Sequence, residues 1–177
     1  MRKLLGAIVL LLAASAVSAQ ELPDGHGPGV GVEQNLGGLT GATFVYDAGR
    51  FHVDVLLGLE HISRTGPDTS SFGIAGRFFF VVHRMERADF GLGGGIGIAR
   101  TDFGDAHETN IELEGAAQIR AFIAPNVAVL ASLGLVIATA DNGGLPGGPI
   151  VEGGNGDTEI GLGGQLFGGF GVTYYFR

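Results

Sequence analysis

Apolar residues alternate with small or polar residues along most of the chain after residue 28, a pattern that predicts β-strands with two different faces. The last stretch, residues 158–177, shows it most clearly, because apolar or aromatic residues recur at every second position, interrupted only by Gly164 and Gly168. These apolar positions are Ile160, Leu162, Leu166, Phe170, Val172, Tyr174 and Phe176. We therefore predict one long C-terminal strand with an apolar face and a glycine-rich or polar face.

Seven earlier segments show the same alternation. The predicted strands are 29–34, 42–46, 51–60, 71–82, 90–99, 111–123 and 127–137. The connections after the second, fourth and sixth strands are short, whereas those after the third, fifth and seventh are longer and polar. Transmembrane barrels show this asymmetry, with tight periplasmic turns at one rim and longer extracellular loops at the other. We expect residues 64–70, 100–110 and 139–157 to meet the outside.

Alternation alone does not say which face of the barrel is outside. Glycine and alanine crowd the non-apolar face, as the narrow interior of an eight-stranded barrel requires, whereas a water-facing strand would carry long polar side chains there. The apolar face stays nearly free of charge over ~10 residues per strand, the length that a tilted strand needs to cross a membrane. We interpret the apolar face as lipid-facing. A soluble secreted lipocalin-like barrel that binds a small ligand is the alternative.

The N-terminal residues predict a cleaved signal peptide. Met1, Arg2 and Lys3 form a basic start, an apolar run too short to span a bilayer follows, and residues 17–19 supply a small-residue cleavage pattern. We expect a signal peptide over 1–19, a flexible leader over 20–28 and the barrel over 29–177. The chain contains no cysteine, which excludes a lipoprotein anchor and disulfide bonds.

Composition narrows the possible partners. The formal net charge is −8, and loss of Arg2 and Lys3 with the signal peptide removes two positive charges and leaves −10. Such a surface argues against nucleic acid as a partner, because phosphate binding needs a basic footprint. The chain has 45% hydrophobic residues and no apolar stretch of helical membrane-spanning length outside the predicted signal peptide. Closing strands into a barrel lets such a chain satisfy its backbone hydrogen bonds in lipid.

Together, the signal peptide, the strand count, the loop asymmetry and the final Phe-x-Val-x-Tyr-x-Phe pattern resemble the small eight-stranded outer-membrane barrels of Gram-negative bacteria, the OmpA/OmpX-like superfamily. The resemblance implies an all-β, eight-stranded, antiparallel, up-and-down transmembrane barrel in the bacterial outer membrane. It implies a structural or surface-interaction role without enzymatic activity, cofactor or large pore. The implied partners are outer-membrane lipid and the barrel-assembly machinery, which reads an aromatic C-terminal residue in that family. In this chain Arg177 follows Phe176.

His61 and Ser63 form a candidate catalytic pair. A spacing of two puts both side chains on one face of a strand, as a base and a nucleophile require. The pair resembles the His-x-Ser pair of outer-membrane lipid A deacylases, but Arg64 stands where that family has asparagine, and the pair lies in the first half of the chain. We expect a solvated strand end here, with a lipid A-modifying hydrolase as the alternative function.

Cofactor and metal sites are not predicted. The glycine clusters at 91–97 and 161–171 match no nucleotide-binding motif. The five histidines are scattered without the short spacings of metal-ligand pairs. Asp102, Asp105 and Glu108 share one loop but lack the fixed spacing of a calcium-binding loop, so we expect a hydrated acidic loop.

Charged residues at inward positions predict an ion network inside the barrel. Counting from their shared loop brings Asp54 and Arg77 to similar depth on neighbouring strands, and Arg120 lies within reach on the opposite wall. Glu112 and Glu114 lie nearer the outer rim, where they either join this network or reach the water at the mouth. A buried arginine without a carboxylate is costly, so we expect Asp54 and Arg77 to pair.

Overall fold

The computed structural model describes residues 26–37, 39–63, 68–104, 106–143, 157–164 and 166–176. Within these ranges the chain forms strands only. The strands are β1 (His26–Asn35), β2 (Thr40–Ala48), β3 (Phe51–Ile62), β4 (Thr69–Arg84), β5 (Ala88–Asp102), β6 (His107–Ala124), β7 (Val127–Gly143), β8 (Asp157–Leu162) and β9 (Gly169–Tyr175). A helix long and apolar enough to cross a membrane is not found in the described part of the chain.

Several predicted segments lie outside the described residues. They are the signal peptide, most of the leader, residues 64–67 and 144–156 of the predicted outer loops, and Asp105.

The strands form a closed antiparallel barrel. From β1 to β7 each strand pairs with its neighbours along the chain. β9 pairs with β1 on one side and with the first part of β7 on the other, while β8 pairs with the later part of β7. β8 and β9 therefore share the eighth position of the barrel, and the predicted eight-stranded antiparallel fold is confirmed.

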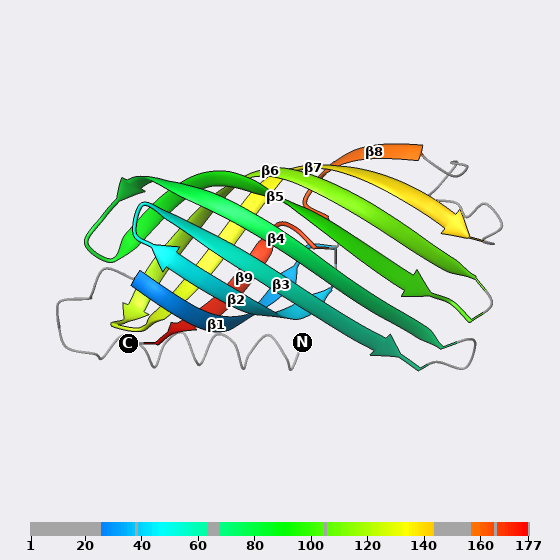
Figure 1. Cartoon of the computed structure of the whole chain (residues 1–177), viewed down its shortest axis with the longest axis horizontal. Coiled ribbons are helices and arrows are strands. Elements are labelled where there is room, and N and C mark those ends of the chain that lie inside the picture. The colour runs from blue at the N-terminus through cyan, green and yellow to red at the C-terminus, as the bar shows by residue number, and fades with distance from the viewer. Residues whose placement is uncertain are drawn as a thin grey trace, which may run out of the picture.

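The two ends of the barrel differ as the sequence predicts. In Figure 1, β2, β4 and β6 end at the left, and β3, β5 and β7 end at the right. The first hairpin is short, because β1 and β2 have 10 and 9 residues, whereas the strands from β3 to β7 have 12 to 18. Its connection falls short of the right end, and Leu39 within it is buried.

The prediction of one uninterrupted C-terminal strand is wrong at residues 163–168. Gly163 and Gly168 have φ angles of 71° and 69°, a left-handed conformation that glycine adopts without steric cost, and the chain between them leaves the sheet. Leu166, which alternation assigns to the outward face, is instead completely buried together with Phe167. The amide groups of Leu36 and Gly37 donate to carbonyl groups of this segment. We call residues 163–168 the inward segment.

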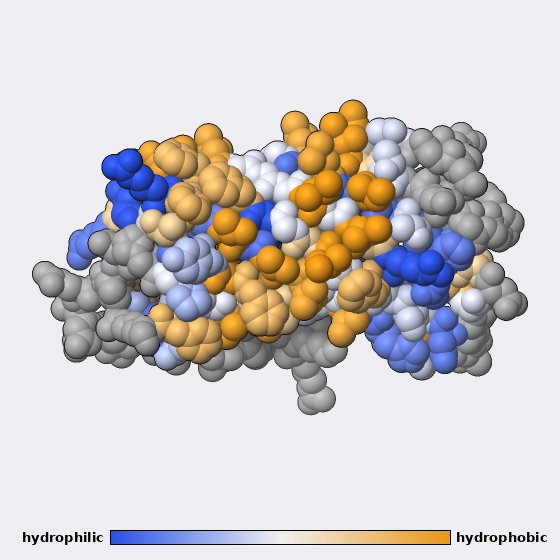
Figure 2. Space-filling model, viewed as in Figure 1, coloured by the Kyte–Doolittle hydropathy of each residue, from blue (hydrophilic) through white to orange (hydrophobic). Residues whose placement is uncertain are grey.

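Outside the inward segment, alternation sorts side chains as expected. β2 alternates strictly between exposed and buried residues, and most of β3 and β4 does the same. Large apolar side chains such as Phe44, Val55, Ile96 and Leu133 are exposed, while the charged side chain of Arg77 is buried. Figure 2 shows the apolar side chains mainly across the middle of the visible face, with hydrophilic residues gathered toward the two ends.

Inward glycines make room for large side chains from other strands. A Cβ atom at Gly95 would lie 2.7 Å from Arg77 Cγ and 2.7 Å from Phe167 Cε1. A Cβ atom at Gly97 would lie 2.6 Å from Leu166 Cδ1. The glycine-rich inward face of β5 therefore accommodates both an arginine and the inward segment, in agreement with the sequence expectation of small residues inside.

Candidate functional site

Charged side chains gather inside the barrel, where six carboxylates and two guanidinium groups of the described residues are buried. They are Glu33, Asp47, Asp54, Arg77, Asp89, Glu112, Glu114 and Arg120. They come from six strands, β1 to β6, so each strand contributes at least one inward charge. Each arginine is the centre of a separate cluster of carboxylates.

Arg77 binds two carboxylates, Glu33 on β1 and Asp54 on β3. Its Nη1 and Nη2 atoms donate to Glu33 Oε1 and Oε2 at 2.5 and 2.6 Å, and Nη2 also donates to Asp54 Oδ2 at 3.2 Å. Asp54 and Arg77 are register partners on β3 and β4, at the common depth that the sequence predicts. The two parallel hydrogen bonds to Glu33 are the strong bidentate geometry of an arginine–carboxylate pair. Glu33 is thus the main partner of Arg77.

Arg120 belongs to a second cluster, nearer the short turns. Its Nε and Nη2 atoms donate to Asp89 at 3.0 and 2.7 Å, and Asp89 is its register partner on β5. Its Nη1 atom lies 2.7 Å from Asp47 Oδ2 and donates to the Tyr175 hydroxyl at 2.9 Å. Arg120 therefore binds these three residues and does not pair with Asp54, so the expected single network is divided into two clusters.

His52 and Gln118 form a hydrogen-bonded pair between the two clusters. His52 Nε2 donates to Gln118 Oε1 at 2.7 Å and lies 3.9 Å from Asp54 Oδ1. Gln118 stands two residues before Arg120 on β6, and its amide oxygen can only accept a hydrogen bond. The His52 ring also stacks on Phe79, with ring centroids 5.3 Å apart. Both polar side chains are thus held in fixed positions between the ionic groups.

Glu112 and Glu114 are buried inside the barrel, 3% and 5% exposed, and do not reach water at the mouth. Glu112 Oε2 accepts a hydrogen bond from the backbone N–H of Leu166 at 3.1 Å, so this carboxylate holds the inward segment in place. The two carboxylate oxygens of Glu114 have no hydrogen-bond partner among the described residues. The two glutamates therefore have different surroundings although they are neighbours on one face of β6.

An apolar plug closes the interior on the long-loop side of Arg77. It consists of Leu39, Leu56, Ala75, Ala99, Val136, Leu166 and Phe167. Leu39 comes from the short first hairpin and Leu166 and Phe167 from the inward segment, so two connections supply three of its four largest side chains, and β3 supplies the fourth, Leu56. The Phe167 ring and Arg77 share the space over Gly95. The plug thus covers the ionic cluster from the end with the longer loops.

Three carboxylates of the clusters were missed by the sequence reasoning. Asp47 and Asp89 lie in the short connections between the predicted strands, and Glu33 lies within the first predicted strand, 29–34. Asp47 follows Thr43 and Val45 at intervals of two, so extending the alternation by one residue into each turn would have identified Asp47 and Asp89. Glu33 needed no extension, because it follows Gly31 on the inward face of its strand.

His61 and Ser63 are close together at the long-loop rim. His61 Nε2 lies 3.1 Å from Ser63 Oγ, and His61 Nδ1 lies 2.9 Å from Ser70 Oγ. All three side chains are exposed. The histidine is thus in contact with a serine at each ring nitrogen, which is the reach required of a nucleophile and its base. A hydroxyl group, not a carboxylate, contacts the second nitrogen.

Two acidic residues of the predicted outer loop, Asp102 and Glu108, each pair with a nearby side chain. Arg100 binds Asp102, with Nη2 and Oδ1 3.0 Å apart, and Asn110 Nδ2 donates to Glu108 Oε1 at 2.6 Å. Across the described ranges, no three histidine or acidic side chains are grouped in a way that would hold a metal ion. The described acids of this loop therefore contact protein partners.

Comparison of the chain with protein-family models, with curated proteins and with solved structures finds no match.

Proposed function

We propose that the protein is an integral outer-membrane β-barrel with a structural or surface-interaction role, without enzymatic activity and without a large pore. The observation that carries this proposal is the inverted distribution of polarity. Arg77 and Arg120 are almost completely buried, whereas side chains such as Phe80, Leu135 and Ile137 on the outer wall are exposed. A protein in water covers most of its apolar side chains and exposes its charges.

The outer wall carries exposed apolar side chains around the whole circumference of the barrel, as contact with lipid requires. Every strand exposes large apolar residues at alternate positions, including Val32 on β1, Phe72 on β4 and Phe170 on β9. Apolar contact with the hydrocarbon core and complete pairing of the backbone are the two requirements for a strand in a membrane. A soluble lipocalin-like barrel would instead need these residues inside, where this chain has ion pairs.

The filled interior supports a role without a large pore. The two arginine clusters occupy one part of the lumen, and the apolar plug closes the part next to it. Eight strands leave an interior just wide enough for side chains. We therefore expect reconstituted protein to give no stable conductance of porin size.

Cell fractionation tests the location. We expect the full-length chain, expressed in a Gram-negative bacterium, to be found in the outer-membrane fraction and to change gel mobility on heating, as folded barrels do. Protease added to intact cells should cut it only in the longer connections. Recovery of folded protein in the soluble periplasmic fraction would favour the lipocalin-like alternative and refute our proposal.

Substitution of one outward residue tests the assignment of the faces. Leu133→Arg places a charge at mid-strand on the outer wall and should destabilise the barrel in lipid by about 2–4 kcal/mol. The inward neighbour Ser132 provides the control, because Ser132→Ala removes only a small buried hydroxyl group. The measurement is denaturant unfolding in lipid vesicles, followed by circular dichroism because the chain has no tryptophan. Equal effects at the two positions would contradict the assignment of the faces.

Lipid ester hydrolysis is a second candidate function, and the contact between His61 Nε2 and Ser63 Oγ favours it. In this function Ser63 would attack the ester carbonyl and His61 would accept its proton. The exposed position of both residues and the hydroxyl of Ser70 at the second ring nitrogen argue against strong activation. Purified protein should release no fatty acid from lipid A. Release that is lost in Ser63→Ala would establish the hydrolase instead.

A further inference from the structure

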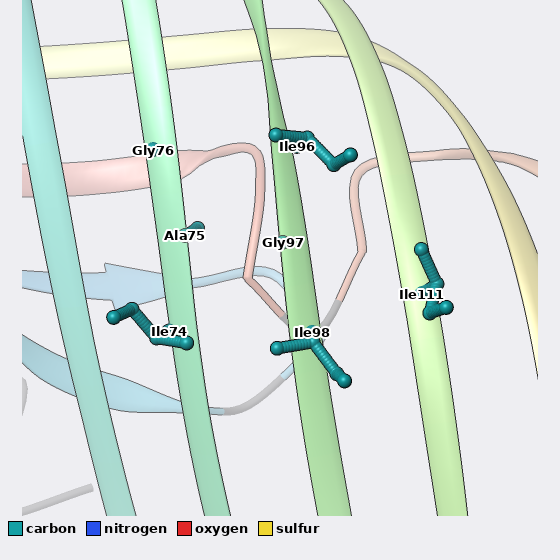
Figure 3. Close-up of a pocket in the computed structure, with 7 residues that line it drawn as sticks. All are labelled: Ile74, Ala75, Gly76, Ile96, Gly97, Ile98 and Ile111. Carbon is teal, nitrogen blue, oxygen red and sulfur yellow. The ribbon is translucent and has the colours of Figure 1, made fainter.

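The outer faces of β4, β5 and β6 form a shallow apolar groove (Figure 3). Its edge toward the longer loops is a row of isoleucines, because Ile74, Ile98 and Ile111 are register partners on the three strands. In the next row toward the middle of the barrel, Gly76 stands opposite Ile96. The wall is hollow where β4 has no side chain, and the groove has a volume of about 360 Å³.

Packing does not explain the glycine that keeps this groove open. A Cβ atom added to Gly76 would meet no atom within 4 Å. Gly94, two residues before Ile96 on β5, is different, because a Cβ atom there would clash with the backbone oxygen of Glu114. A side chain would therefore fit at position 76, and its absence leaves space for another molecule.

A cationic side chain stands directly above the groove, on the side of the longer loops. Arg100 follows Ile98 at the next outward position of β5, and its register partners are Phe72 and Thr109. Its Nε and Nη2 atoms donate to Asp102 Oδ1 at 3.1 and 3.0 Å, and both side chains are about half exposed. The outer wall thus changes from apolar to charged within one row.

The groove lies within one leaflet of a membrane. On β5 its lining runs from Ile98 to Ile96, and Arg100 is the next outward residue beyond Ile98. Arg100 and Ile96 are four residues apart, which is about 14 Å at ~3.4 Å per residue. With a strand tilt of about 40°, this corresponds to a depth of about 10 Å, a third of the ~30 Å hydrocarbon core.

We propose that this groove binds one acyl chain of a lipid in the outer-facing leaflet, and that the lipid has an anionic phosphate head group in contact with Arg100. The inference rests on the proposed membrane location and adds the class of lipid that is bound. The apolar lining selects an acyl chain, and the guanidinium group selects a negative head group over a zwitterionic one. The pair with Asp102 sets a limit to this preference, because the carboxylate competes with the phosphate for Arg100.

Native mass spectrometry of the folded full-length barrel tests the proposal. The protein is exchanged from detergent into an equal mixture of phosphatidylglycerol and phosphatidylcholine with identical chains, and the retained lipid is counted. Wild-type protein should retain one phosphatidylglycerol molecule preferentially. Arg100→Gln should reduce this preference by about tenfold, the effect of one charge-assisted hydrogen bond. Asp102→Asn should increase it, and Arg87→Gln at the opposite rim should leave it unchanged.

A substitution in the apolar part of the site provides a second test. Gly76→Leu places a side chain in the groove at a position where its Cβ atom meets no atom within 4 Å, and it should abolish retention of both lipids. Ala42→Leu on the outer face of β2 should not. Equal retention of the two lipids by wild-type protein, or retention unchanged in Gly76→Leu, would refute the inference. Heat-dependent gel mobility and insertion into vesicles are measured on the same samples. Failure to insert refutes the membrane proposal, whereas insertion without lipid preference refutes only the groove.

Discussion

The two parts of the barrel interior are filled by different means. Around Arg77 and Arg120, side chains from regular strands meet in ion pairs. In the apolar plug, Leu39, Leu166 and Phe167 come from segments that connect strands. The ionic part thus follows from strand alternation, whereas the plug requires the chain to leave the sheet.

This difference assigns a role to each part. Ion pairs between neighbouring and distant strands fix the register of a barrel, because each carboxylate must reach one particular guanidinium group. The plug adds an apolar layer that separates Arg77 from the water at the end with the longer loops. Removal of water strengthens the ion pairs and also increases the cost of breaking one partner.

The largest effect is expected from an unpaired arginine. Glu33→Ala removes the bidentate partner of Arg77 and leaves Asp54 at 3.2 Å, so we expect a loss of about 3–5 kcal/mol in the free energy of unfolding. The triple variant Glu33→Ala, Asp54→Asn and Arg77→Met should recover part of that loss, because it removes Arg77 together with both carboxylates that bind it. Denaturant unfolding in lipid vesicles measures all three proteins.

The control for this experiment is an exposed ion pair. Asp102→Ala breaks the half-exposed pair with Arg100 and should cost about 0–1 kcal/mol. If Glu33→Ala costs no more than Asp102→Ala, the Arg77 cluster does not stabilise the barrel, and the contrast between its two interior parts disappears.

A smaller effect is expected in the plug. Leu166→Ala should destabilise by about 2–5 kcal/mol, because it leaves a cavity among buried side chains. Leu162 is the matched control, since alternation assigns both leucines to the outer face, yet Leu162 is 69% exposed and Leu166 is 0% exposed. Leu162→Ala should cost much less in the same unfolding measurement. A similar loss at both positions would contradict the inward path of the chain.

Strand alternation was sufficient to predict the architecture. The outward apolar faces, the inward position of Arg77 and the alternation of short turns with longer loops all follow from a period of two. The pairing of Asp54 with Arg77 was predictable because neighbouring strands share a loop. Glu33 and Arg77 are separated by two strands in the sheet, so their contact depends on the curvature of the closed barrel, which the sequence does not state.

The inward segment was harder to predict for a different reason. Gly164 and Gly168 fall at outward positions of the alternation, so they were interpreted as gaps in an apolar face. The left-handed conformation of Gly163 and Gly168 instead releases the chain from the sheet, and the apolar side chain of Leu166 then packs inside. A glycine in a strand can weaken pairing or begin a bend, and local sequence does not distinguish the two.

The smallest effect is expected at the glycine where the chain begins to turn inward. Gly163 has a φ angle of 71°, and a side chain in this left-handed conformation costs about 1–2 kcal/mol. Gly163→Ala should therefore destabilise by that amount, with further contact between the new Cβ atom and Leu36 Cδ1 at 3.0 Å.

Gly161 provides the comparison, because it lies two residues earlier in β8 and a Cβ atom there would be no closer than 3.8 Å to its nearest neighbour. Gly161→Ala should leave the free energy of unfolding almost unchanged or increase it slightly, since alanine restricts the unfolded chain. If both substitutions are neutral in vesicles, the left-handed turn is not required, and the eighth strand can continue through residues 163–168. In that case Leu166 would lie on the outer face of the barrel, and the plug would lose the side chains that close the interior.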